Sequence, residues 1–178
     1  MKGRVIMNNE LNICIVGMGS RGLTVLEQII HQAPRYKTQF AAVFVHMVDP
    51  GKPGVGIHDT DQPEYFLLNT ICSQLTAFSE PSSKEHLCFY QWSKQRYQSV
   101  RTIDPGDFLP RRWLGEYLSW SYEMLCQQAP DHLRMKHYQT EAVDIQSSRC
   151  GRERVILQDH TSILAEGVFL TTGHANIK

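Results

Sequence analysis

The feature that most constrains the fold of this chain is a glycine-rich turn placed directly after a short apolar stretch. Residues 11–22 read LNICIVGMGSRG, which is an apolar run followed by the pattern G-x-G-x-x-G. In such a turn Gly17 permits a tight bend, Gly19 lets a pyrophosphate approach the backbone, and Gly22 lets the next helix pack on the strand. The helix then points free N–H groups at the phosphates. The segment therefore predicts a dinucleotide site.

A lone G-x-G-x-x-G is weak evidence for a dinucleotide site, so the residues that follow it must also fit one. A helix is expected next, because apolar residues recur at helical spacing at Leu23, Leu26, Ile29 and Ile30. It should end between Pro34 and Gln39, and residues 41–48 are typical of a second strand that ends at Asp49. An acid there can bind both hydroxyls of a ribose, although its distance from Gly22 exceeds the usual spacing of about 20 residues. The alternative is a surface turn with an unrelated aspartate.

Composition narrows the class of protein. The 178 residues suit one domain, and 18 basic against 18 acidic residues give a net charge of zero, unlike a nucleic-acid binder. We expect a cytoplasmic protein without a membrane partner, because there is no long apolar stretch and residues 1–11 do not resemble a secretion signal. Five dispersed cysteines without a C-x-x-C pair predict reduced thiols and no metal site.

The middle of the chain predicts loops and two helices. Residues 50–56, PGKPGVG, form either a solvent loop or a loop that a ligand approaches closely. Residues 66–78 mix apolar and polar side chains and are expected to line a pocket. Helices are expected within 84–98 and over 111–128, and the aromatic stripe of the second is more typical of a core. The pair at 111–112, Arg-Arg, is either solvated or an anion clamp.

The last fifty residues alternate as strands do. Short strands are expected at 133–138, 141–146 and 154–158, with a hairpin turn at Asp159 and His160. Residues 167–173 are expected to form a buried strand whose end, Thr172-Gly173, presses against the cofactor. The predicted fold class is α/β, a Rossmann-like parallel sheet with flanking helices on both faces and a small antiparallel insert.

Four segments in this order resemble the FAD/NAD(P)-binding flavoprotein family, which has a glutathione-reductase-like Rossmann fold. They are similar to a bacterial branch of that family and read GMGSRGL at 17–23, DPGKPGVG at 49–56, TDQPEYFLLNT at 60–70 and PRRWLGEYLSW at 110–120. The part from Gln74 to Trp120 is more distantly similar to lysine and ornithine N-hydroxylating monooxygenases.

The resemblance implies a set of cofactor-binding residues. In that family the first turn binds the FAD pyrophosphate and the acid after the second strand binds the adenosine ribose. Carried over, these roles and the contacts nearer the flavin fall on Gly17, Gly19, Ser20, Arg21, Gly22, Asp49, Pro50, Gly56, Gln74, Thr172 and Gly173. Arg21 and Arg111 either contact phosphate or are solvated. No catalytic residue is assigned.

The resemblance also implies an activity. It indicates an FAD-dependent oxidoreductase, of the monooxygenase type, in which NAD(P)H reduces the flavin and a small molecule is the substrate. Family members usually continue with a second glycine fingerprint for NAD(P)H, so residues 1–178 are expected to be the FAD-binding domain at the N-terminus of a longer enzyme, inactive alone. Two alternatives stay open: a dehydrogenase that uses only a nicotinamide, and a non-catalytic binding module that works with a partner.

Overall fold

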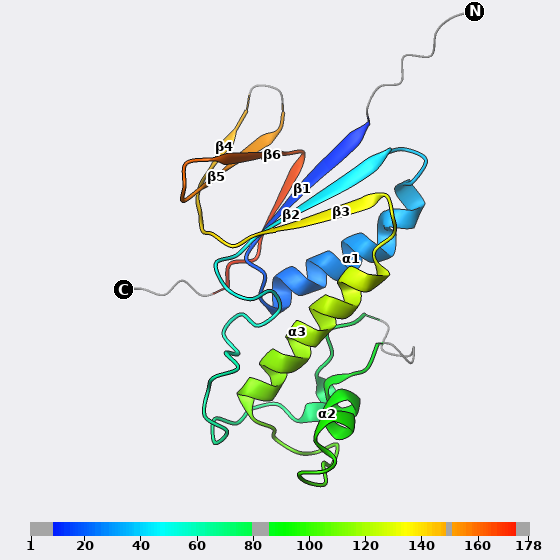
Figure 1. Ribbon diagram of the computed structural model, residues 1–178, viewed down its shortest axis with the longest axis vertical. Helices are drawn as coiled ribbons and strands as arrows, with labels where there is room; N and C mark the ends of the chain where they lie inside the picture. The colour runs from blue at the N-terminus through cyan, green and yellow to red at the C-terminus, as the bar shows by residue number, and fades with distance from the viewer. Residues whose placement is uncertain (1–8, 80–85, 149–150, 174–178) are drawn as a thin grey trace, which may run out of the picture.

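The structure is a computed structural model that describes residues 9–79, 86–148 and 151–173 (Figure 1). Its first part is a strand, a helix and a strand: β1 (Glu10–Val16), α1 (Ser20–Tyr36) and β2 (Ala42–Val48). A short 3-10 helix η1 (Cys72–Gln74) and the helices α2 (Phe89–Tyr97) and α3 (Arg111–Gln128) follow. The last part holds β3 (Leu133–Tyr138), β4 (Ala142–Ser147), β5 (Glu153–Leu157), β6 (Ser162–Ala165) and β7 (Gly167–Leu170).

Four strands form a parallel sheet in the order β3-β2-β1-β7. Val16 at the end of β1 pairs with Val48 of β2 and with Leu170 of β7, and Val48 also pairs with Tyr138 of β3. All four strands therefore end at the same level. The turn into α1 leaves the sheet at this edge, which places it beside the ends of β2 and β7.

The side chains of β1 alternate between two apolar layers, as they must in a strand. Ile13 and Ile15 pack with α1 and α3 in one core, whereas Cys14 and Val16 lie on the opposite face. That second face is covered by an antiparallel sheet, β4-β5-β6, whose inward residues are Val155, Leu157, Ile163 and Ala165. The Rossmann-like α/β fold is confirmed, but the expectation of helices on both faces is wrong, because the insert itself supplies the apolar cover (Figure 1).

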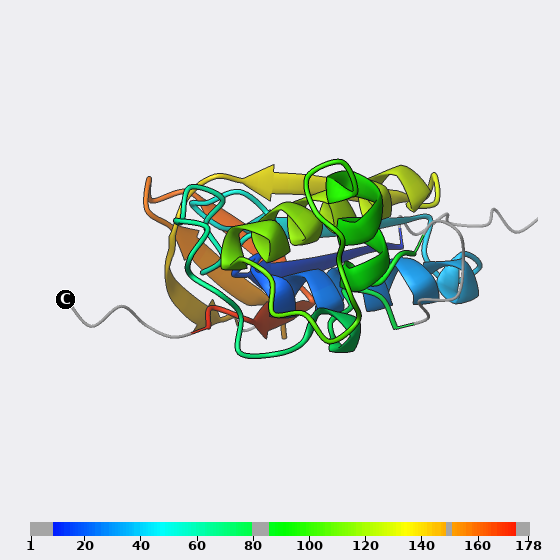
Figure 2. The same cartoon turned by 90° about the horizontal axis from the view of Figure 1, so that it is seen from below.

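Helix α3 spans the range expected from the sequence, and its aromatic stripe is core. Tyr117 is fully buried, where its hydroxyl accepts a bond from Ala77 N (3.0 Å) and donates one to Leu87 O (2.8 Å). Trp92 of α2 packs on the Tyr117 ring at 5.7 Å between centroids. Seen from below, α2 and its neighbouring loops stand in front of α1 and α3 (Figure 2). Helix α3 thus shares one apolar core with the sheet and with α2.

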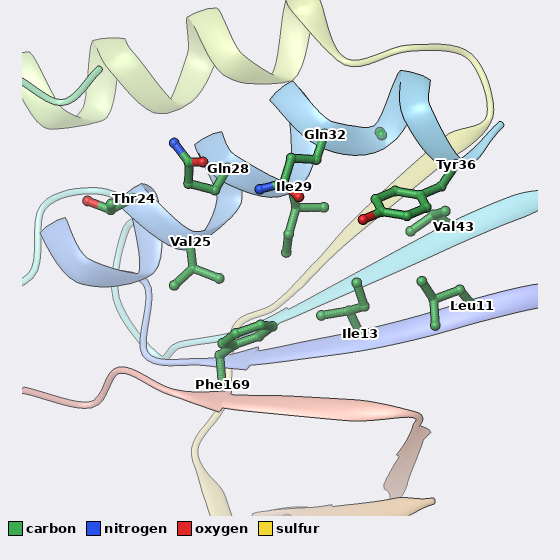
Figure 3. Close-up of a pocket in the computed structure, with 11 residues that line it drawn as sticks. Leu11, Ile13, Thr24, Val25, Gln28, Ile29, Gln32, Tyr36, Val43 and Phe169 are labelled. Carbon is green, nitrogen blue, oxygen red and sulfur yellow. The ribbon is translucent and has the colours of Figure 1, made fainter. Parts of the chain in front are cut away.

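Strand β7 is not the buried strand that its apolar sequence predicts. It is the last strand of the sheet and pairs only with β1, and the side chains of Phe169 and Leu170 are 44% and 66% exposed. Phe169 faces an apolar groove of about 430 Å³ beneath α1, with Ile13, Val25 and Ile29 in its walls (Figure 3). An edge strand has one neighbour rather than two, so its apolar residues are only partly covered.

Within the described ranges no helix is long and apolar enough to cross a membrane. The cysteines described there, Cys14, Cys72, Cys88 and Cys126, are free thiols, and Cys150 lies outside the described residues. Burial raises the pKa of the Cys14 thiol to about 12, so this thiol is a core residue rather than a nucleophile. In the same ranges no group of three His, Cys, Asp or Glu side chains is placed to hold a metal ion.

Candidate cofactor-binding site

A cavity of about 580 Å³ opens where β1, β2 and β7 end. This volume lies within the range of roughly 300–1,000 Å³ of small-molecule sites. Its walls come from the turn into α1, the connection after β2, the residues after β7 and the link between β3 and β4. Ligands of open α/β sheets bind at this carboxyl edge of the strands.

Most residues expected from the sequence meet in this cavity. Its lining includes Gly17, Gly19, Ser20, Arg21, Asp49, Pro50, Gly56, Thr172 and Gly173. Gly22 lies behind the lining, in the first turn of α1. Gln74 lies on η1, is exposed and contributes nothing to this lining, nor do the other residues of 66–78. The binding roles of all these residues stay predictions.

The three glycines of the turn meet different constraints. Gly17 has φ +94°, and a Cβ there would lie 2.7 Å from Thr171 O. A Cβ on Gly22 would overlap the carbonyl oxygen of Gly17. Gly19 has an ordinary extended backbone, and among the described residues its Cβ would meet only Gly56 Cα, at 3.4 Å. The protein's own packing therefore requires the first and third glycines, while the second keeps open a part of the cavity.

Helix α1 begins at this cavity without a cap of its own. Gly19 stands at the N-cap, no side chain caps the first turn, and that turn holds no acidic residue. The first N–H groups of a helix have no partner within the helix, and the helix dipole makes this end positive. These donors and the cavity beside Gly19 fit a bound pyrophosphate.

The glycine loop after β2 is clamped between this turn and α3. Gly54 N donates to Met18 O at 2.6 Å, and a Cβ on Gly54, which has φ +89°, would lie 2.5 Å from Leu118 O. Further along, the carbonyl oxygen of His58 lies directly against Gly115 of α3. The interpretation of residues 50–56 as a loop that only faces solvent is wrong, because residues 53–55 are buried. The loop forms one wall of the cavity.

His58 belongs to that wall and was not expected from the sequence. Burial, and to a lesser degree the charge of Arg111, lowers the pKa of its ring. Its Nδ1 atom is buried and makes no hydrogen bond to the described residues. A neutral ring at this place can donate one hydrogen bond to a ligand or accept one from it.

Thr171 is a second residue that the sequence interpretation missed, since it singled out Thr172. The Thr171 hydroxyl donates to Gly17 O at 2.6 Å, and Thr171 N donates to Val16 O at 2.8 Å. Thr171 therefore fixes the end of β7 to the first glycine of the turn. The strand-ending Thr-Thr-Gly is a usable signal, but only the parallel pairing of β7 with β1 tells the two threonines apart.

The arginine pair at the start of α3 lies outside the cavity lining. Arg112 pairs with Glu64 and with Glu116, each at 3.7 Å, and Arg111 Nε donates to Leu67 O at 3.3 Å. Both side chains are thus engaged within the protein. The structure favours a structural role over an anion clamp for this pair.

The sequence from residue 14 to residue 175 matches the FAD-NAD(P)-binding family. The chain belongs to this family. The match confirms the family expected from the sequence and supports FAD and NAD(P) as its cofactors.

Two curated proteins of related sequence are enzymes. Nitrosuccinic acid synthase of Aspergillus oryzae is 28% identical over 171 residues, which are 92% of this chain and 26% of that protein. The nitrosuccinate-forming L-aspartate N-monooxygenase of Streptomyces cremeus is 28% identical over an alignment of 193 positions, which covers 93% of this chain and 29% of the enzyme. This chain therefore spans little more than a quarter of the length of these relatives.

Solved flavoprotein structures share the fold of this family member. A cyclohexanone monooxygenase variant from Rhodococcus sp. Phi1, bound to NADP⁺, has a TM-score of 0.58 at 12% identity over 93% of this chain and 26% of its own. OTEMO in complex with FAD and NADP has a TM-score of 0.57 at 13% identity, over 94% of this chain and 27% of its own. At these identities the likeness concerns the fold alone.

Proposed function

We propose that the chain is the FAD-binding domain of a flavin-dependent monooxygenase that works in the cytoplasm on a small amino acid. The observation that carries the proposal is the uncapped start of α1, which opens into a cavity beside Gly19. Membership of the FAD-NAD(P)-binding family supports the cofactor, and the similarity to the Streptomyces enzyme, an L-aspartate N-monooxygenase, supports the substrate class.

In this proposal each part of the cavity wall binds a different part of FAD. The amide groups of Ser20 and Arg21 hold the pyrophosphate, because anions bind at helix N-termini. Asp49 accepts hydrogen bonds from the adenosine ribose. Thr172 and Gly173 lie at the end of β7 and approach the flavin half of the cofactor. When it is bound, FAD supplies hydride acceptance and oxygen chemistry, and the protein orients and shields it.

The nicotinamide and the substrate are assigned to other parts of the enzyme. The chain spans little more than a quarter of the length of its curated relatives. We therefore assign residues 1–178 to the N-terminal portion of a longer enzyme, and expect catalysis only when that enzyme is whole.

Two other functions make different predictions. A dehydrogenase that uses only a nicotinamide would bind NAD(P)H but not FAD in this cavity. A non-catalytic module would bind FAD without the later chemistry even in the full-length protein. Residue Asp49 is compatible with each of them, because the adenosine ribose is common to FAD and NAD(P).

The test is an equilibrium titration of the purified chain with FAD and, separately, with FMN and NADPH, followed by flavin fluorescence or calorimetry. FAD should bind saturably at one site. FMN should bind far more weakly, because it has neither the pyrophosphate nor the adenosine ribose. Binding of NADPH without FAD would favour the dehydrogenase, and equal binding of FMN and FAD would contradict the proposal.

A further inference from the structure

Asp49 is bonded within the protein through every polar atom that it has. Its main-chain N–H donates to Tyr138 O (3.1 Å), and its main-chain oxygen accepts a bond from His137 Nε2 (2.9 Å). Its carboxylate accepts two more bonds, from Gly51 N to Oδ1 (2.7 Å) and from Met18 N to Oδ2 (2.6 Å). The residue is therefore fixed to β3, to its own loop and to the glycine turn.

The bond to Met18 reaches the centre of the turn, since Met18 stands between Gly17 and Gly19. A backbone N–H bonded to a carboxylate makes a short bond, roughly twice as strong as one between neutral groups. The Met18 side chain is fully buried, and its carbonyl oxygen accepts the bond from Gly54. Two hydrogen bonds thus fix the backbone of Met18, and Asp49 accepts one of them.

We infer that Asp49 is a positioning residue for the pyrophosphate, in addition to any contact that it makes with the ribose. Through Met18 N–H its carboxylate sets the backbone path into Gly19, and through Gly51 N–H it sets the facing loop. The inference rests on the proposed FAD site. Its consequence is that removal of the carboxylate weakens even ligands that have no ribose hydroxyls to offer.

Two nucleotides separate the two roles. ADP has a diphosphate and both ribose hydroxyls, whereas 2′,3′-dideoxy-ADP keeps the diphosphate and lacks both hydroxyls. Calorimetric titration of Asp49→Ala should show dideoxy-ADP weakened about tenfold or more, the usual effect of losing bonds to a charged acceptor, and ADP weakened at least as much, because ADP also loses any ribose contact. A residue that acts only on the ribose would lose affinity for ADP and leave that for dideoxy-ADP unchanged, and this result, or no loss for either probe, would overturn the inference.

A matched control lies on the same connection. The carboxylate of Asp59 accepts a bond from Asp61 N at 3.0 Å, and Asp59 is not one of the residues that line the cavity. Asp59→Ala should leave both affinities unchanged. An equal loss in Asp59→Ala would show a general effect of loosening the loop, and would count against the inference.

Folding and the site itself are checked separately. Amide proton resonances in ¹⁵N-labelled protein should move at Met18 and Gly51 in Asp49→Ala, while those of β5 stay in place. If that variant does not fold, Asp49→Asn keeps one carbonyl acceptor and should weaken both probes to a smaller degree. Failure of the unaltered chain to bind FAD and ADP would contradict the proposed function. If the unaltered chain binds FAD but Asp49→Ala loses affinity for ADP and not for dideoxy-ADP, this inference alone is wrong.

Discussion

Gly115 of α3 packs against the carbonyl oxygen of His58 so closely that a Cβ at this position would overlap it. The contact lies behind the cavity and not in it. It shows why a helix far from the glycine turn in sequence matters for the site: α3 is the surface on which the loop after β2 rests, and a shift of that surface would move the cavity wall.

We predict that Gly115→Ala lowers both stability and cofactor affinity. Overpacking a closely fitted contact costs about 1–3 kcal/mol. The free energy of unfolding should fall by this amount in urea denaturation, and FAD should bind more weakly. Gly106→Ala is the matched control, because a Cβ there meets nothing within 4 Å in the part of the chain that the structure describes. Equal behaviour of the two variants would contradict the packing of α3 against the loop.

The glycines of the turn should separate stability from binding. Gly17→Ala forces a strained backbone and a clash with Thr171, so the ligand-free protein should lose stability. Gly19→Ala makes an ordinary contact with Gly56 and should leave the unfolding curve of the ligand-free protein nearly unchanged while weakening FAD. Thermal denaturation without ligand, followed by FAD titration, tests the split. A large loss of stability in Gly19→Ala would mean that its space is needed by the protein rather than by a ligand.

Thr171 should act through its hydroxyl. Thr171→Val keeps the shape but removes the bond to Gly17 O, and should cost about 1 kcal/mol of stability, since a partly buried acceptor loses a partner. Thr171→Ser keeps the hydroxyl and should behave more like the unaltered protein. Urea denaturation of the three proteins provides the comparison, and a loss in Thr171→Ser without a loss in Thr171→Val would assign the effect to the methyl group instead.

Stability should fall in acid, with His46 as one cause. The ring lies 3.0 Å from Tyr138 OH and 3.1 Å from Asn12 Oδ1, and burial, helped by Lys136, lowers its pKa below the usual 6.5. The folded state therefore binds fewer protons than the unfolded chain below pH 6.5, so the free energy of unfolding decreases as the pH falls through this range. His46→Gln should flatten that decrease, and His58 should account for part of what remains. An unchanged slope would remove His46 from the account.

The sequence predicted what depends on short-range pattern. The turn at Gly17–Gly22, the strand that ends before Asp49 and the extent of α3 follow from local periodicity and glycine placement, and the structure bears them out. Nine of the eleven expected residues line one cavity, because parallel strands end at one edge.

What the sequence could not predict depends on how the elements assemble. Residues 133–138 alternate like the strands after them, yet they join the parallel sheet, and only the register with β2 reveals this. The apolar sequence of β7 indicates burial, but the strand lies at the sheet edge. His58 and Thr171 enter the cavity wall through the packing of α3 and the pairing of β7, and neither is visible in a local pattern.

The location of the cofactor is tested most directly by following the backbone amide resonances of the ¹⁵N-labelled chain as FAD is added. If FAD binds in the cavity at the glycine turn, saturable shifts should centre on Gly19, Ser20 and Thr172, at the ends of β1 and β7, with little change in α2. Shifts centred instead on Val25, Ile29 and Phe169, in the apolar groove beneath α1, would contradict this location.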